Sequence, residues 1–314
     1  MDAPRYSFVI PVFDEEETLP ELERRLRAVL DGLDGPAEVI LVDDGSSDRS
    51  PELLAEMSRR DPRFRTIHFT RNFGHQMAIT AGLDRARGDA VVVMDGDLQD
   101  PPEIIPTFLD HFRRGYDVVY AQRVDRQESW WLRISYFLFY RLLARLSSIA
   151  LPLDAGDFSL MSRRVVEGLR SAPERNRYLR GLRTWVGFRQ LGVPVPRPER
   201  YAGSSHYSVW ALLRLAFDGI FAFSIVPLRA AAILGAGAIG ASGLYVFWAL
   251  YAKFILRESP QGFTTLIVAI IFLSGVNLLF LGIVGEYVGR VYEEVKRRPL
   301  YVVDNVRRGT GSGT

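Results

Sequence analysis

The sequence predicts an α/β fold, a mostly parallel sheet covered by helices, followed by a hairpin of two transmembrane helices. Between residues 7 and 123, short apolar runs alternate with segments whose apolar residues recur at helical spacing. This is the pattern of a parallel sheet with helices on both faces. Further on, residues 230–252 and 263–285 carry no charge. At a rise of 1.5 Å per residue each stretch spans roughly 34 Å, and the hydrocarbon core of a bilayer is about 30 Å thick.

The composition excludes several classes of protein. Lys and Arg total 39 against 37 Asp and Glu, a net charge of +2, which is too balanced to suggest a nucleic-acid-binding protein. The chain has no cysteine, so disulfides and thiol catalysis are excluded. Residues 1–5 lead directly into an apolar run. We therefore expect no signal peptide and a catalytic portion that stays in the cytoplasm.

The alternating pattern defines the expected elements in turn. Strands are expected at residues 7–13, 39–42, 66–69, 91–94 and 118–123, and helices at 18–30, 50–60, 75–87 and 102–114. Another strand is expected at 185–195, ended by prolines at 194, 196 and 198. The first strand is not followed by GxGxxG, and the chain has no GxxxxGKS/T. The sequence therefore lacks the phosphate-binding turns of dinucleotide-binding and P-loop proteins.

The most informative stretch is residues 91–102, where a run of apolar residues ends in Asp95 and Asp97. Open α/β sheets bind ligands at the carboxyl ends of their strands. Alternation along a strand lets both carboxylates face the same way, and Gly96 permits close approach of a ligand. Such hard oxygen ligands suit Mg²⁺ or Mn²⁺ carrying a diphosphate; the alternative is an acidic, solvated turn. Asp100 precedes two prolines, so we expect it to cap the next helix instead.

The middle of the chain contains two amphipathic segments. Within 130–151, arginines lie on one helical face opposite aromatic and aliphatic residues, which favours a helix in a membrane interface. The alternative is a helix packed on its own domain. Residues 206–228 are expected to form a second, juxtamembrane amphipathic segment, and 154–160 a turn into a short strand.

The two apolar stretches are joined by a loop too short to be a domain, so they form a hairpin within residues 229–290. Arg229 precedes the first stretch, and Arg290 with residues 296–298 follows the second. The positive-inside rule then places both chain ends in the cytoplasm of a multi-pass inner-membrane protein. We expect a cytosolic catalytic domain at 1–205 and a cytosolic tail at 291–314. Glycines in both stretches and residues 298–303 are candidates for homo-oligomer contacts.

Several motifs together resemble a known family. Residues 10–16, 42–48, 71–74 and 95–101 resemble glycosyltransferase family 2. The element around Asp157, the loop at 200–207, residues 223–229 and the two apolar stretches narrow the resemblance to bacterial polyprenyl-phosphate glycosyltransferases, relatives of dolichyl-phosphate mannose synthase. The resemblance covers nearly the whole chain.

The resemblance implies a GT-A fold that transfers a sugar, with inversion, from a nucleotide sugar to a polyprenyl phosphate such as undecaprenyl phosphate. Its implied partners are therefore a nucleotide-sugar donor, a polyprenyl phosphate and membrane lipid, with no nucleic acid. UDP-glucose is the first choice of donor, and GDP-mannose, UDP-N-acetylglucosamine and UDP-4-deoxy-4-formamido-arabinose are alternatives. The implied cofactor is Mg²⁺ or Mn²⁺.

The resemblance also implies the site residues. The nucleotide would be bound by Pro11, Phe13, Glu15, Asp43, Asp44 and Asp95. The metal would be held by Asp95, Asp97 and Gln99, and phosphate or acceptor by Arg123, Arg200, Ser205 and His206. Asp97 and Asp157 are the catalytic candidates, although Asp157 is alternatively an orienting or sugar-binding group. The chain departs from the family where Phe13 replaces the common tyrosine, Asp14 an asparagine and His206 a lysine.

Two other functions fit part of the same pattern. A processive polysaccharide synthase shares the first motifs but needs a QxxRW element and more membrane spans, and residues 183–185 do not supply that element. A catalytically silent membrane adaptor is disfavoured by the intact carboxylates.

Overall fold

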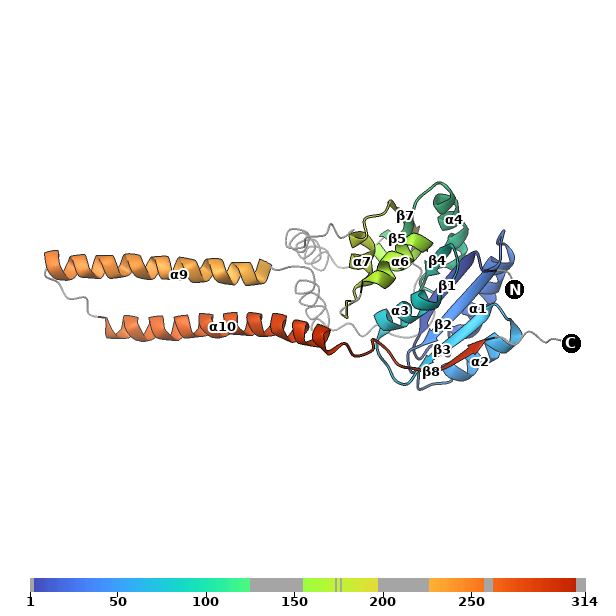
Figure 1. The fold of residues 1–314 in the computed structure, drawn as a ribbon, viewed down its shortest axis with the longest axis horizontal. Helices are drawn as coiled ribbons and strands as arrows, with labels where there is room; N and C mark the ends of the chain where they lie inside the picture. The colour runs from blue at the N-terminus through green and yellow to red at the C-terminus, as the bar shows by residue number, and fades with distance from the viewer. Residues whose placement is uncertain are drawn as a thin grey trace. The chain divides into compact units, whose positions relative to one another are not determined.

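The computed structural model describes residues 3–124, 155–172, 174–175, 177–196, 226–256 and 262–308. The chain divides into two compact units. One holds the sheet and includes the segment that follows residue 298, and the other holds two long helices. We describe each unit by itself (Figure 1).

Within the described residues, eight strands form one sheet in the order β7-β5-β6-β4-β1-β2-β3-β8. The strands are β1 (Tyr6–Val12), β2 (Ala37–Asp43), β3 (Phe64–Phe69), β4 (Ala90–Val93), β5 (Val118–Val124), β6 (Ala155–Ser162), β7 (Gln190–Pro196) and β8 (Val303–Arg308). The central strands β4, β1, β2 and β3 are parallel. Strands β6 and β8 run antiparallel to their neighbours. The sheet is thus mostly parallel, as predicted.

Helices cover both faces of this sheet, because successive residues of a strand point to opposite sides. Phe8 and Ile10 belong to one buried core with residues of α1, α2 and α4, whereas Val9 belongs to a second core with residues of α3, α6 and α7. The helices are α1 (Leu19–Asp31), α2 (Ser50–Arg60), α3 (His75–Arg85), α4 (Ile105–Arg113), α6 (Arg163–Ser171) and α7 (Leu179–Trp185). Burial on both faces explains the near-continuous apolar runs that predicted these strands.

Two local predictions were wrong. The strand expected at 185–195 begins later, because Trp185 ends α7, and β7 continues through Pro194 to Pro196. Those prolines are tolerated because β7 lies at the edge of the sheet, where a residue without an N–H need not remove a hydrogen bond between strands. Asp100 makes no side-chain cap, and the helix at 102–114 instead begins as a 3₁₀ turn, Pro102–Ile104, before α4.

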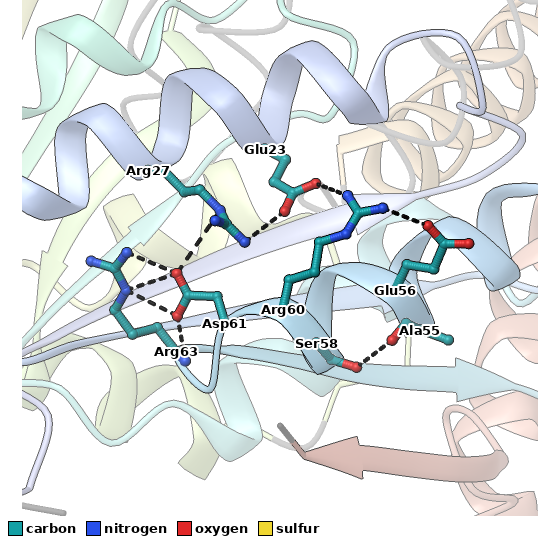
Figure 2. Close-up of polar contacts among 8 residues, drawn as sticks. All are labelled: Glu23, Arg27, Ala55, Glu56, Ser58, Arg60, Asp61 and Arg63. Atoms are coloured by element: carbon teal, nitrogen blue, oxygen red, sulfur yellow. Dashed lines mark hydrogen bonds and ion pairs between the residues drawn. The ribbon is translucent and has the colours of Figure 1, made fainter. Parts of the chain in front are cut away.

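An ion-pair network joins α1 to α2 and to the start of β3 (Figure 2). Glu23 on α1 contacts both Arg27 at 2.8 Å and Arg60 of α2 at 3.5 Å. Asp61, directly after α2, binds Arg63 at 2.8 Å. Partly exposed pairs of this kind contribute only about 0–1 kcal/mol each, so the network fixes how the helices pack more than it stabilises the fold.

The C-terminal segment differs most from expectation. We expected a tail at 291–314, but residues 291–296 extend α10 and β8 pairs with β3 as an edge strand (Figure 1). Tyr301, just before β8, stacks on Phe69 of β3 with ring centroids 5.0 Å apart. Its hydroxyl donates to Asp84 at 2.8 Å and accepts from Arg85 at 3.1 Å. This segment is therefore part of the sheet unit.

The second unit contains two helices that are long and apolar enough to cross a membrane by length and composition. α9 (Val226–Tyr251) continues into a π-helical segment, Ala252–Leu256, and α10 spans Phe263–Lys296. The membrane-length stretches are Leu228–Ile255 and Ala269–Lys296, of mean hydropathy 1.7 and 2.0. The interfacial helix expected at 130–151 and most of the segment at 206–228 lie outside the described residues.

Candidate active site

The predicted acidic residues meet at one edge of the sheet. Asp43 ends β2, and Asp95 and Asp97 follow β4, so all three lie at the carboxyl ends of parallel strands. β6 runs antiparallel to β4, with Val93 opposite Ser159. Asp157 lies two residues before Ser159 in β6, and therefore toward the end of β4 that Asp95 follows. The topology therefore brings a carboxylate from the start of β6 to the edge where open α/β sheets bind ligands.

The loop after β1 is cross-braced to the loop after β2. The backbone N–H of Asp14 donates to Ser46 Oγ at 3.0 Å, and that of Ser47 donates to Asp14 Oδ1 at 2.8 Å. Asp14 has a φ of 50°, a left-handed conformation that asparagine and aspartate tolerate better than other non-glycine residues. Because either side chain offers the oxygen that Ser47 needs, aspartate can replace the family's common asparagine here.

The expected nucleotide-binding residues on this loop lie at the same edge. Pro11 lies in β1, and the side chain of Phe13 is 46% exposed. The Glu15 N–H donates to Ser50 Oγ at 2.9 Å, and its carboxylate accepts from Thr18 Oγ1 at 2.8 Å. A ligand bound at this edge would therefore contact an exposed aromatic ring on a loop that hydrogen bonds hold in place.

Asp43 and Asp44 are buried and both hold neighbouring loops. Asp43 bonds His68 Nδ1 and accepts from the Ser46 N–H, each at 2.9 Å. Burial acts to raise the pKa of Asp43, but the bonds from His68 and Ser46 outweigh it and lower the pKa. Asp44 accepts from the N–H groups of Phe73 and Gly74 at 2.7 and 2.9 Å. For Asp44 burial dominates, and its pKa is raised.

The turn after β4 is organised by its own carboxylates. Asp97 Oδ1 accepts from the Gln99 N–H at 3.1 Å, and the intervening Leu98 has a φ of 60°. Asp100 Oδ2 accepts from the Asp95 N–H at 3.4 Å. Asp100, expected to cap a helix, thus closes this turn. Outside the turn, His75 Nε2 bonds Asp95 Oδ1 at 2.9 Å.

Three basic residues that the sequence analysis did not single out surround Asp157: His75, Arg180 and Arg183. Arg180 of α7 forms a bidentate pair with Asp157, Nε to Oδ1 at 2.8 Å and Nη2 to Oδ2 at 2.9 Å. Burial acts to raise the pKa of Asp157, but the charges of Arg180 and His75 outweigh it and lower the pKa. Burial lowers the pKa of Arg183 to about 10. Arg180 and Arg183 lie three residues apart, about one helical turn, so they share a face of α7. This spacing was the sequence signal that could have identified them.

The family follows from direct comparison. Residues 7–170 match the family model of Glycosyl transferase family 2. The chain belongs to glycosyltransferase family 2. Its sheet is the GT-A fold of that family, and the chain is a transferase by membership.

Relatives in the family match nearly the whole chain. An uncharacterized glycosyltransferase, YkcC of Bacillus subtilis, is 46% identical over 95% of this chain and 93% of its own length. The SfII prophage-derived bactoprenol glucosyl transferase of Shigella flexneri is 39% identical over 97% of this chain and 99% of its own. Among solved structures, glucosyl-3-phosphoglycerate synthase from Mycobacterium tuberculosis, in complex with Mn²⁺, UDP-glucose and phosphoglyceric acid, is 19% identical with a TM-score of 0.47, covering 70% of this chain and 79% of that one.

The acidic edge of this family 2 domain fits a divalent cation. In the part of the chain that the structure describes, no group of three or more His, Cys, Asp or Glu side chains converges as a complete metal site. A cation that carries a diphosphate needs only one or two protein carboxylates, because phosphate oxygens and water complete its ligands. Asp95 and Asp97 supply such carboxylates, and each carboxylate offers about four lone-pair positions that a hydrogen bond and a cation can share.

Several predicted residues fall beyond what the structure describes. Arg123 lies in β5, at the same end as the acidic edge, but its side chain is outside the described residues. Arg200, Ser205 and His206 lie outside them altogether. Their expected contacts with phosphate or acceptor therefore stay predictions.

Proposed function

We propose that this protein transfers glucose from UDP-glucose to a polyprenyl phosphate, undecaprenyl phosphate in bacteria, at the cytoplasmic face of the inner membrane. The observation that carries the proposal is the extent of the match to the relatives named bactoprenol glucosyl transferase. At 39% identity it covers 97% of this chain, the acidic sheet edge and the two apolar helices alike. An enzyme that glycosylates a lipid needs both a site for the sugar donor and a segment that holds it at the membrane.

The donor would lie across the carboxyl edge of the sheet. Pro11, Phe13 and Glu15 on one loop, with Asp43 and Asp44 on the next, would form the nucleoside pocket. The exposed ring of Phe13 offers a surface for a base to stack on. The carboxylate of Asp44, held by two backbone N–H groups, would contact the base from a fixed position.

The diphosphate would lie beside β4. Asp95, Asp97 and Gln99 would hold Mg²⁺ or Mn²⁺, which when bound neutralises the charge that develops on the leaving diphosphate. His75 fixes the orientation of Asp95 through its bond at 2.9 Å. A second-shell bond of this kind is a common means of orienting a ligand.

The transfer is a single displacement. A phosphate oxygen of the acceptor attacks the anomeric carbon, a new carbon–oxygen bond forms, and the bond to the diphosphate oxygen breaks with its electron pair leaving on UDP. The anomeric configuration inverts. The second pKa of a phosphomonoester is about 6, so the attacking phosphate is already largely ionised at neutral pH and needs little help from a general base. Arg123, Arg200, Ser205 and His206 would bind phosphate oxygens of the donor or of the acceptor.

The two apolar helices would hold the enzyme at its lipid substrate. α9 and α10 would cross the membrane as a hairpin, with both termini in the cytoplasm, because basic residues flank its outer ends. Association of several chains through the glycines of these helices is part of the proposal.

The test is a donor panel with purified enzyme, undecaprenyl phosphate and Mg²⁺ or Mn²⁺. UDP-glucose, GDP-mannose, UDP-N-acetylglucosamine and UDP-4-deoxy-4-formamido-arabinose are each supplied with a labelled sugar. We expect a chloroform-extractable sugar lipid from UDP-glucose. Label from another donor would correct the sugar, and a failure to form any sugar lipid would overturn the function. Near wild-type turnover by Asp95→Asn or Asp157→Asn would remove that residue from the mechanism.

A further inference from the structure

Asp157 is held at both of its oxygens. Arg180 approaches it side-on, with Nε and Nη2 each within hydrogen-bond distance of a different oxygen. The side chain of Asp157 is 8% exposed. This fork-to-fork geometry is the strongest form of an arginine–carboxylate interaction and fixes the plane of the carboxylate.

A second arginine holds the backbone beside Asp157. Arg183 lies one turn further along α7 and is 3% exposed. Its guanidinium contacts the carbonyl oxygen of Gly156 through Nη1 and Nη2 at 3.5 and 3.4 Å, and lies 5.0 Å from the ring centre of Tyr120. Its Nε has no hydrogen-bond partner in the described part of the chain. Burying a charged guanidinium with such long hydrogen bonds costs free energy. This cost indicates that Arg183 has a role other than stability.

The helix that carries both arginines is tied to the Asp95 side of the site. The Leu179 N–H, at the start of α7, donates to the side-chain oxygen of Gln76 at 3.0 Å. Gln76 follows His75, the residue that bonds Asp95. The first turn of α3 thus sets the position of α7 relative to the turn after β4.

The charges around Asp157 favour its ionised form. Arg180 donates to both of its oxygens, and the charges of Arg183 and His75 also act on the carboxylate. A carboxylate that accepts both donors of a guanidinium and lies in such surroundings keeps its charge at neutral pH. Because the acceptor phosphate is largely ionised at neutral pH, the transfer does not require Asp157 to accept a proton.

We propose that Arg180 and Arg183 are positioning residues that hold Asp157 as a fixed anion next to the reacting carbon, rather than as a general base. The inference rests on the proposed function. Glycosyl transfer passes through a transition state with positive charge on the sugar ring, and a preorganised carboxylate stabilises that charge without reorientation.

The main variants are Arg180→Gln and Arg180→Lys, assayed as full-length enzyme in detergent with the donor and acceptor that the panel identifies. We expect Arg180→Gln to lower kcat by about 100-fold, the typical effect of losing one preorganised electrostatic contact, with the KM for donor changed less than about threefold. Arg180→Lys, which keeps the charge but loses the fork, should fall between this variant and the wild type. Arg183→Gln should also lower kcat at nearly constant donor KM.

The matched control is Arg164→Gln. Arg164 forms a similar bidentate pair with Asp117, Nε and Nη2 each at 2.5 Å, but its side chain is 64% exposed. This control should keep kcat within about twofold of the wild type, because Arg164 pairs with Asp117, which precedes β5, and not with a residue of the acidic edge. Thermal unfolding of every variant shows whether a low kcat reflects loss of the fold. If Arg180→Gln does not fold, Arg180→Lys carries the test.

A solvent isotope comparison separates the two roles of Asp157. A fixed anion transfers no proton, so we expect kcat of the wild type to be nearly equal in H₂O and D₂O. A ratio of about 2 or more that disappears in Asp157→Asn would identify a general base and overturn the inference. It would also be overturned if folded Arg180 variants matched the Arg164→Gln control. If the wild type formed no sugar lipid from any donor, the proposed function itself would fail.

Discussion

The ring of Tyr301 stacks on that of Phe69, residues that lie on opposite sides of the apolar helices in the sequence. The chain that leaves the sheet unit before α9 is thereby fastened to it again after α10.

Tyr301→Ala should destabilise the sheet unit by about 2–4 kcal/mol, because it removes a stacked ring. Tyr301→Phe keeps the ring and loses only the hydrogen bonds to Asp84 and Arg85, so we expect a cost of about 1 kcal/mol. Chemical unfolding in detergent, followed by intrinsic fluorescence, measures both. Equal effects of the two variants would show that stacking contributes nothing.

Asp14→Asn should leave both stability and the KM for donor nearly unchanged, because asparagine tolerates the φ of 50° and offers an oxygen to Ser47. Asp14→Ala should cost about 1–2 kcal/mol through backbone strain and weaken donor binding. Donor KM and thermal unfolding of the two variants provide the measurement. A large effect of asparagine would mean that the negative charge at this position matters.

Gly45→Ala and Gly74→Ala separate steric clash from backbone strain. Both glycines have positive φ, 73° and 104°. A Cβ at Gly45 would lie 2.5 Å from the backbone carbon of Arg71, whereas one at Gly74 meets nothing within 4 Å. We expect a cost of about 1 kcal/mol at Gly74 and at least about 3 kcal/mol at Gly45, where clash adds to strain. Similar unfolding free energies would contradict this.

Glu38→Gln should make the fold less sensitive to acid. Glu38 accepts from Ser7 Oγ, the Arg87 N–H and Arg65 Nη1 at 2.8, 2.9 and 2.6 Å. Burial acts to raise the pKa of Glu38, but these donors outweigh it and lower the pKa below 4.5. Its contribution to stability is therefore present above about pH 4.5 and is lost as the pH falls through the lowered pKa.

We expect the variant to lose about 2 kcal/mol at pH 7, and its difference from the wild type to shrink below about pH 4.5. Unfolding free energies measured from pH 7 to pH 3 check this. The control is Glu103→Gln, whose partner Arg25 lies in an exposed pair and whose loss should cost less than about 1 kcal/mol. A difference at Glu38 that grows with acid would contradict the assignment.

His75→Ala should raise the Mn²⁺ concentration needed for half-maximal activity by about 10-fold or more, because Asp95 loses the bond that orients it. Activity of the wild type should disappear with a chelator and return with added Mn²⁺ or Mg²⁺. His111→Ala, on α4, is the control and should behave as the wild type. An unchanged metal requirement in His75→Ala would exclude this role.

The sequence was informative where burial alone decides structure. Val91 to Val93 are covered on both faces, so their apolar run identified β4, and the carboxylates after it were placed at the correct edge. The two uncharged stretches likewise identified α9 and α10. In each case the apolar pattern of one continuous segment is enough to identify the element.

The missed features depend on contacts between distant segments. Arg180 meets Asp157 because α7 packs on β6, and His75 meets Asp95 because α3 packs against the central strands of the sheet. β8 has six residues and gains its stability from β3, which lies more than 200 residues earlier. Periodicity does not specify such pairings. Asp100 matched a capping pattern in the sequence, but in the structure its carboxylate accepts from the Asp95 N–H in the turn after β4.

The return of the chain to β3 makes the apolar hairpin an insertion in the sheet unit rather than an appendage to it. A truncated enzyme that stops before α9 would leave the outer edge of β3 unpaired, and open edges invite aggregation. A water-soluble version should therefore retain residues 298–308 and rejoin them, by a flexible linker, to the chain that precedes the hairpin.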